Sequence, residues 1–196
     1  MEKIRIRRAE QEDIGRICRM IHLIDEAMEN PDYFFADDDS FVERHVEKEG
    51  FILLAESGAE PVGYLVIRFP GQAQDNLLRD LYEHNRKAFD TCVGERWDAG
   101  DGEFPGSCGI DRMNLVAHFE SAGVLPAYRG RGIQKQLTRT ALEWLRDMPY
   151  AYYLATVHPE NGASLAGMTG CGFEIAATTF KYGGLVRHIL FRHKNP

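Results

Sequence analysis

The segment VLPAYRGRGIQKQL, residues 124–137, takes the chain from a strand pattern to a helix pattern through a short turn of alternating arginine and glycine. The apolar run LVAHFESAGVL at 115–125 is typical of a β-strand, in which Gly123 is a candidate bulge or splay point. After the turn, a stripe at helical spacing predicts a helix to about Arg146, formed by Ile133, Leu137, Ala141 and Leu145. The segment therefore predicts a strand, a tight turn and a helix in direct succession.

The turn has the composition of an anion site. A strand that turns directly into a helix presents successive backbone N–H groups and the positive helix end to one point. Gly130 and Gly132 allow an oxygen-rich group to approach the backbone, and Arg129 and Arg131 add charge at the rim. Taken alone, the turn is also consistent with solvated arginines or with an arginine–glycine segment that binds RNA.

Before this unit, the sequence predicts the order strand, helix, helix, strand, strand. The alternation IRIR gives the first strand, and apolar residues at three- and four-residue steps predict a helix that ends near Asn30-Pro31. Ser40 and Glu43 have the spacing of a capping box, which predicts a second helix that stops at Gly50. Two β-rich runs then flank a hairpin turn: FILLAES at 51–57 and VGYLVIRF at 62–69.

Residues 70–113 interrupt this pattern. DNLLRDLYEHNRKAF at 75–89 has helical spacing, and the remainder is irregular and rich in glycine, so we expect a helix and a long loop inserted between strands 3 and 4. Loops longer than about 12–15 residues are usually functional or mobile, although a surface excursion is equally consistent. The insertion has too few apolar residues for a core of its own.

The C-terminal part predicts a buried strand, a short helix and two strands joined at Gly183-Gly184. These elements are AYYLATV at 151–157, ASLAGMTG at 163–170, FEIAATTFKY at 173–182 and LVRHILFR at 185–192. We expect one α/β (α+β) domain over residues 1–196, with a mixed sheet flanked by helices, because this length suits a single core. The exposed C-terminal hairpin could pair with a second copy, which leaves a homodimer open.

Charge and cysteine usage narrow the classes of function. The net charge of −7, from 23 basic and 30 acidic residues, argues against nucleic acid as a partner and mildly favours a cationic substrate. No stretch approaches the roughly 18 apolar residues of a membrane span, and the N-terminus lacks the features of a signal peptide. The four cysteines show neither a disulfide framework nor metal-ligand spacing. We expect a soluble cytoplasmic protein with free thiols and no membrane partner.

The arginine–glycine turn resembles the signature of the GCN5-related N-acetyltransferase (GNAT) superfamily, which lies between the fourth strand and the third helix of that fold. The signature is Arg or Gln, two residues of any kind, Gly, one of any kind, then Gly or Ala. Arg129 and Gly132 match it, whereas Gln134 replaces the final Gly or Ala, so its side chain would have to point away from the cofactor. The segment HPENGASLAGMTGCGFE at 158–174 is similar to a later family motif through Asn161, Ser164, Gly172 and Phe173.

The resemblance runs from Ile4 to Arg192, apart from the insertion, and implies a splayed GNAT-like sheet. It also implies acetyl-CoA as cosubstrate and no metal. In the family, the loop amides hold the pyrophosphate of acetyl-CoA, and the pantetheine arm pairs with the fourth strand. The cofactor-binding residues implied here are Val124, Leu125, Arg129, Gly130, Arg131, Gly132, Ile133, Gln134, Asn161 and Ser164.

Acetyl transfer to an amine requires a proton acceptor near the amine. His118 and Glu120 lie two residues apart on one predicted strand, so their side chains face the same side. The resemblance places them where family members carry a catalytic Glu or His. A histidine has an ordinary pKa suited to this task at neutral pH, whereas a glutamate would need an upward shift. A paired strand edge or an ion pair is the structural alternative. A strand N–H near Val124 would hold the thioester carbonyl oxygen.

The family often has a tyrosine four residues before the Gly of its Gly-Phe pair, which protonates the departing thiolate. Met168 stands at that place and has no proton to donate. Either the coenzyme leaves as thiolate, or Tyr152, Tyr153 or Cys171 substitutes, or the protein binds the cofactor without efficient turnover.

The expected function is therefore transfer of acetyl from acetyl-CoA to a primary amine by direct attack, with His118 or Glu120 as base. The alternative is an acetyl-CoA-binding sensor or interaction module. The acceptor, a small molecule or a peptide, is not identified by the sequence. Asp37, Asp38 and Asp39 follow the first predicted helix and could recognise a cationic acceptor, although a solvated charge run explains them as well.

Overall fold

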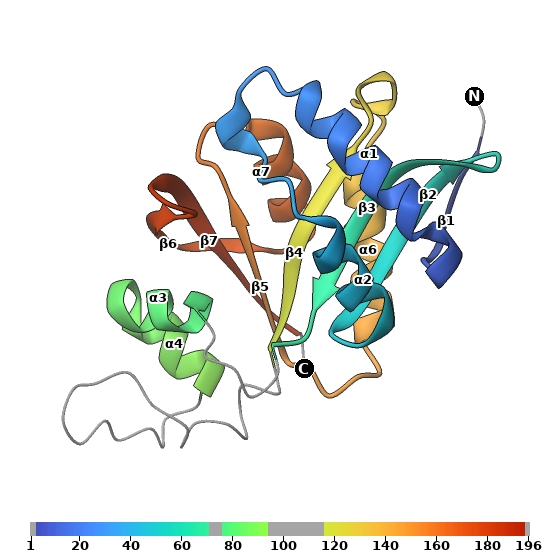
Figure 1. Ribbon diagram of the computed structural model, residues 1–196. Helices are drawn as coiled ribbons and strands as arrows, with labels where there is room; N and C mark the ends of the chain where they lie inside the picture. Colours follow the sequence, from blue (N-terminus) through green and yellow to red (C-terminus); the bar gives the residue numbers. More distant parts are fainter. Residues whose placement is uncertain (1–2, 71–75, 94–115, 195–196) are drawn as a thin grey trace.

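The computed structural model describes residues 3–70, 76–93 and 116–194, whose strands form one seven-stranded sheet (Figure 1). The strand order is β1-β2-β3-β4-β5-β7-β6, and β4 with β5 is its parallel pair. The strands are β1 Ile4–Arg8, β2 Gly50–Ser57, β3 Glu60–Arg68, β4 Val116–Val124, β5 Tyr152–Val157, β6 Glu174–Lys181 and β7 Leu185–His193. The helices are α1 Ile14–Glu26, α2 Asp39–Glu47, α3 Asn76–His84, α4 Arg86–Val93, α6 Ile133–Leu145 and α7 Gly162–Thr169. The predicted mixed sheet flanked by helices is confirmed.

Helices cover both faces of the sheet. On one face, α1 and α2 pack against Tyr64 and Val66 of β3; on the other, α6 packs against Leu65 and Ile67 of the same strand. This alternation follows from the two-residue period of a strand. None of the helices in the described part of the chain is long and apolar enough to cross a membrane.

The sheet splays between its two parallel strands. Pairing between β4 and β5 runs from Val116 opposite Tyr152 to Phe119 opposite Ala155 and ends there. Figure 1 shows the two strands diverging beyond this point, toward α7. Backbone groups at the divergence therefore face a gap in the sheet, and the predicted splayed sheet is confirmed.

The bulge in β4 lies at Glu120. Phe119 pairs with Ile67 and Ser121 with Val66, so Glu120 is the extra residue in the β3–β4 ladder. The expectation of a bulge at Gly123 is wrong, because Gly123 pairs regularly with β3. On the other side of β4 the splay begins after Phe119, so Gly123 lies within the diverged part of the strand. Its missing side chain serves packing instead: a Cβ there would lie 2.7 Å from the Ile24 side chain of α1.

The ends of the first two helices differ from the sequence prediction. Helix α1 ends at Glu26, four residues before the expected Asn30, whose side chain instead accepts from the Asp32 N–H in a short 3-10 turn. Helix α2 is capped by Asp38 and not by Ser40, because the Asp38 carboxylate accepts from the N–H of Phe41 at 2.8 Å. A carboxylate satisfies a helix N-terminus at least as well as a hydroxyl.

The start of the insertion is two helices where one was predicted. Asn85 separates α3 from α4 and caps the second, with its side chain accepting from the Ala88 N–H at 3.0 Å. Lys181 of β6 pairs with Asp80 of α3 at 2.5 Å, which anchors the helices beside the β6–β7 hairpin. The predicted long loop falls on 94–115, outside the described residues.

Arg7 joins three elements at the edge of the sheet. Its guanidinium donates to both Asp13 carboxylate oxygens, at 2.6 and 2.8 Å, and to Glu56 Oε1 at 2.7 and 3.0 Å. The two acidic side chains are nearly buried, with exposed fractions of 7% and 6%. Arg7 therefore compensates two buried charges and holds β1 to β2 and to the start of α1.

Candidate active site

A cavity of about 830 Å³ lies along the splay. Its walls come from the loop between α1 and α2, the β4–α6 turn, the start of α7 and the β6–β7 hairpin, together with the facing parts of β4 and β5. These segments are far apart in the sequence and meet because β4 and β5 diverge. The site is therefore built at the one parallel junction of the described sheet.

The β4–α6 turn forms one end of this cavity. Gly130 and Gly132 have positive φ angles of 74° and 70°, which L side chains rarely adopt, and both line the wall. A Cβ added at either position would meet no atom within 4 Å, so the space beside the turn is open. Gly132 directly precedes Ile133, where the 13-residue helix α6 begins, so the first N–H groups of α6 face the anion site predicted from the sequence.

Most of the predicted cofactor residues lie on the cavity wall. These are Val124, Arg129, Gly130, Gly132, Ile133, Gln134, Asn161 and Ser164. Leu125 and Arg131 are not on the wall. The Leu125 N–H donates to the Val62 carbonyl at 2.9 Å, and the Arg131 guanidinium donates to the Ala127 carbonyl and lies over the Tyr128 ring.

The starts of α6 and α7 are joined beside the cavity. Asn161 caps α7, since its side chain accepts from the Ser164 N–H at 3.1 Å. The Gln134 amide of α6 donates to the Ser164 hydroxyl at 2.9 Å, so the Gln134 side chain is tied to the start of α7 on the cavity wall. A glutamine is thereby accommodated where the family signature has a small residue.

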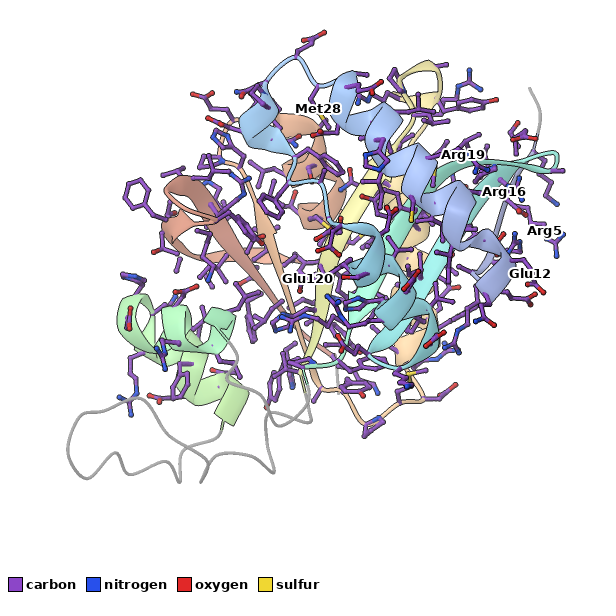
Figure 2. The ribbon with its side chains drawn as sticks, in the orientation of Figure 1. Arg5, Glu12, Arg16, Arg19, Met28 and Glu120 are labelled. Atoms are coloured by element: carbon purple, nitrogen blue, oxygen red, sulfur yellow. The ribbon has the colours of Figure 1, made fainter. Side chains whose placement is uncertain are left out.

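His118 and Glu120 lie together, as predicted, with His118 Nδ1 3.3 Å from Glu120 Oε2. Arg68 of β3 donates to Glu120 from Nε at 3.0 Å, and its Nη2 lies 3.0 Å from His118 Nδ1. Glu120 lines the cavity, whereas His118 is fully buried and does not. Figure 2 shows Glu120 beside β4 in the middle of the molecule.

Glu120 is held in its ionised form. Burial alone would raise its pKa, but the contacts with His118 and the charge of Arg68 outweigh burial and lower the pKa to about 2. A guanidinium only donates, so a neutral His118 accepts from Arg68, while a protonated ring donates to Glu120. In both forms the cavity wall carries a fixed carboxylate at Glu120.

Of two further wall residues, Asp37 was named from the sequence only as one of three acids that could recognise a cationic acceptor, and Tyr182 was not named. Asp37, in the loop before α2, lines the cavity and accepts a hydrogen bond from Ser121 of β4. Tyr182, at the turn of the β6–β7 hairpin, has a positive φ of 50°, and its hydroxyl lies 3.1 Å from Thr156 Oγ1, one residue beyond the last β4–β5 pair. Nothing local distinguishes Asp37 from its acidic neighbours, and the only signal at Tyr182 was its place before Gly183.

The predicted substitutes for the missing tyrosine lie elsewhere. Met168 is buried on the cavity wall, where its sulfur accepts from the Thr138 hydroxyl at 3.8 Å. Tyr152, Tyr153 and Cys171 do not line the cavity. The described tyrosines on the cavity wall are Tyr33, Tyr128 and Tyr182, and the Tyr182 hydroxyl contacts β5 at the splay.

Comparison with known proteins places these features in a family. Residues 69–173 match the family model described as "Acetyltransferase (GNAT) family". This segment contains β4, the β4–α6 turn, α6, β5 and α7, which form most of the cavity wall. No curated protein matches the sequence.

Solved structures show the same fold. Arabidopsis thaliana NAA60 in complex with acetyl-CoA is 15% identical, with a TM-score of 0.67 over 97% of this chain and 99% of that chain. A GNAT-family acetyltransferase from Streptococcus pneumoniae is 16% identical, with a TM-score of 0.65 over 98% of this chain and 100% of that one. An N-acetyltransferase from Staphylococcus aureus, also 16% identical, has a TM-score of 0.62 over 98% of this chain and 99% of that one. At these identities the likeness shows the fold alone.

Proposed function

Because the chain belongs to the GNAT family of acetyltransferases, we propose that it transfers an acetyl group from acetyl-CoA to a primary amine by direct attack. Acetyl-CoA is the cosubstrate of this family, and the protein is an acyltransferase that depends on it. The observation that carries the proposal is the β4–α6 turn, with two left-handed glycines at the head of α6 beside an open cavity.

The donor side of the cavity suits a diphosphate and an extended arm. The N–H groups after Gly132 and the positive end of α6 would bind the pyrophosphate, with Arg129 at the rim. The edge of β4 near Val124 would pair with the pantetheine amides, and a strand N–H there would hold the thioester oxygen. When bound, acetyl-CoA supplies the thioester carbonyl that the amine attacks.

The acceptor side carries the β4 pair of His118 and Glu120. Glu120 faces the cavity as a permanent carboxylate, so we assign to it the attraction and orientation of an ammonium group. His118 lies behind it and holds the carboxylate in place. His118 and Glu120 are the bases expected from the sequence, but a pKa of about 2 makes Glu120 a weak proton acceptor and His118 does not line the cavity, so we assign to this pair the binding of the ammonium group and not its deprotonation.

A second candidate function rests on Met168. Its thioether stands where the family often has a proton-donating tyrosine, which favours a module that binds acetyl-CoA with little turnover. Tyr182 favours the enzyme, because its hydroxyl lies at the splay, 3.1 Å from Thr156 Oγ1, and would be a proton donor near the donor-binding space.

Thiol release separates the two functions. The purified chain would be mixed with acetyl-CoA and, in turn, spermidine, tyramine, a lysine amide and a peptide with a free N-terminus. Thiol production that depends on one of these amines supports the enzyme. Calorimetric binding of acetyl-CoA without thiol release on any amine supports the module, and no binding contradicts both.

The variant Glu120→Gln tests the acceptor side. It keeps an oxygen that can accept from Arg68 and removes the fixed charge, so the KM for a cationic amine is expected to rise about 10-fold with little change in kcat. Glu43→Gln, an exposed residue of α2 outside the cavity wall, is the matched control. An unchanged KM in Glu120→Gln would remove Glu120 from the acceptor site.

A further inference from the structure

Asp37 reaches the acceptor end of the cavity from an irregular loop. Ala36 packs on the core beneath α1, while Phe35 and Asp37 line the cavity. Asp38 follows at once and caps α2, which fixes the end of the loop. The Asp37 carboxyl is therefore held toward the cavity by its neighbours on both sides.

The bulge at Glu120 supplies the partner of Asp37. The extra residue puts Ser121 in register with Val66, whose side chain packs on the α1 face, so Glu120 and Ser121 both point to that side of the sheet. Ser121 bonds Asp37, and its Oγ lies 3.0 Å from the hydroxyl of the fully buried Tyr64. An ionised carboxylate only accepts, so Ser121 donates to Asp37 and accepts from Tyr64.

Two of the carboxylates on the wall, Asp37 and Glu120, are in opposite electrostatic environments. Glu120 is paired with Arg68, whereas the contacts of Asp37 are with a hydroxyl and with like charges. Burial raises the pKa of Asp37 to about 6; the Ser121 hydrogen bond opposes this rise, and the charges of Glu120 and Asp38 add to it. Tyr64 from β3 and Tyr182 from the hairpin are the other titratable groups near it.

We propose that Asp37 is the catalytic residue that accepts the proton of the acceptor ammonium group, with Ser121 and Tyr64 as positioning residues. This inference rests on the proposed function. A base works best when its pKa lies near the working pH, and of Asp37 and Glu120 it is Asp37 that meets that condition. Glu120 then holds the cation while Asp37 takes its proton.

The Asp37 carboxylate takes one proton from R–NH₃⁺, and the lone pair of the resulting amine attacks the thioester carbonyl carbon. The C–N bond forms, the C–S bond breaks with its electron pair on sulfur, and the second amine proton goes to that sulfur. The products are an acetamide and a thiol, and Asp37 returns its proton to water.

The test uses the full chain, acetyl-CoA and whichever amine of the panel above gives the fastest thiol release. Asp37→Asn is expected to lower kcat/KM at pH 7 about 100-fold, with the Kd for acetyl-CoA unchanged in calorimetry. The matched control is Asp147→Asn, an exposed aspartate after α6 and outside the cavity wall, which stays within about twofold.

The pH profile separates catalysis from structure. In the wild type, kcat/KM is expected to fall as the pH drops through about 6, and Asp37→Asn should lack this limb. Ser121→Ala removes a hydrogen bond that lowers the pKa of Asp37, so its limb should move to higher pH. A merely structural role for Ser121 would lower the rate without moving the limb.

An active wild type whose Asp37→Asn variant keeps its kcat/KM within threefold, with the same acid limb, overturns the role of Asp37 and leaves the acetyltransferase proposal intact. A wild type that binds acetyl-CoA but releases no thiol overturns the proposed function, and the assignment of Asp37 with it. If the fall of kcat/KM at low pH occurs at the same pH in Ser121→Ala as in the wild type, Ser121 is not a positioning residue.

Discussion

Replacing Gly132 with glutamate is expected to weaken acetyl-CoA binding about 1,000-fold, which corresponds to roughly 4 kcal/mol. Gly132 has φ +70°, so any side chain there carries backbone strain of about 1–2 kcal/mol. The new carboxylate would enter the open space beside the turn, where the pyrophosphate is proposed to bind. Two like charges about 5 Å apart near a protein surface repel by roughly 3 kcal/mol. Strain and repulsion therefore act together at the head of α6.

Calorimetric titration with acetyl-CoA measures this loss. The control is Gly58→Glu, which changes the net charge equally and places a side chain at a similar φ of 62° in the exposed turn between β2 and β3. That variant should bind acetyl-CoA like the wild type. If Gly132→Glu binds within tenfold of the wild type, the turn does not hold the phosphates.

Arg7→Ala is expected to lower the free energy of unfolding by about 3 kcal/mol. Removing one partner of a buried ion pair leaves its counter-charge uncompensated, which typically costs about 3–5 kcal/mol. Here the Asp13 and Glu56 carboxylates are both nearly buried, while Arg7 is 25% exposed, so water offsets part of the loss. Denaturant unfolding at pH 7 measures the difference, and Arg5→Ala, on an exposed residue of the same strand, should change stability little.

The destabilisation caused by Arg7→Ala should depend on pH. Hydrogen bonds from Arg7 lower the pKa of Asp13 below its ordinary value. A depressed carboxyl pKa contributes stability that is fully present above the ordinary pKa near 3.8 and is lost as the pH falls through the lowered value. The difference in free energy of unfolding between the wild type and Arg7→Ala should therefore become smaller at acidic pH. A gap that stays constant down to pH 2 would contradict the ion-pair explanation.

The parts of the fold with a local cause could be predicted from the sequence. The strand–turn–helix unit around Gly132 depends on hydrophobic periodicity and on glycine conformation, both of which are visible within a few residues. The resemblance to the GNAT family then predicted that the sheet splays and which residues line the donor side of the cavity. The roles of the predicted cofactor residues stay predictions.

The errors come from contacts between distant segments. Gly123 was expected to mark the bulge, but its small size serves packing against Ile24 of α1, a hundred residues away in the sequence. Asn85 splits one predicted helix into two, and its side chain also bonds the Ala176 carbonyl of β6. Periodicity alone contains no information on such contacts.

The acceptor side was the least predictable part of the site. His118 and Glu120 were predicted to face the same side, and their 3.3 Å contact confirms it. Their electrostatics depend on Arg68, which the sequence places fifty residues earlier. In the sequence, nothing distinguishes Asp37 from the two aspartates that follow it. In the structure, the bulge at Glu120 turns Ser121 to the same side of the sheet, where Ser121 is the partner of Asp37.

The burial of Asp37 has a thermodynamic consequence for the whole chain. Its folded pKa of about 6 lies above the ordinary 3.8, so the fold favours the protonated carboxyl, and this contribution to stability is lost as the pH rises through 6. Above pH 6 the folded protein carries Asp37 mainly in the ionised form that the proposal requires, and this form is less stable against unfolding than the protonated one. Selection for heat resistance alone would be expected to discard this carboxylate, and only selection for turnover would retain it.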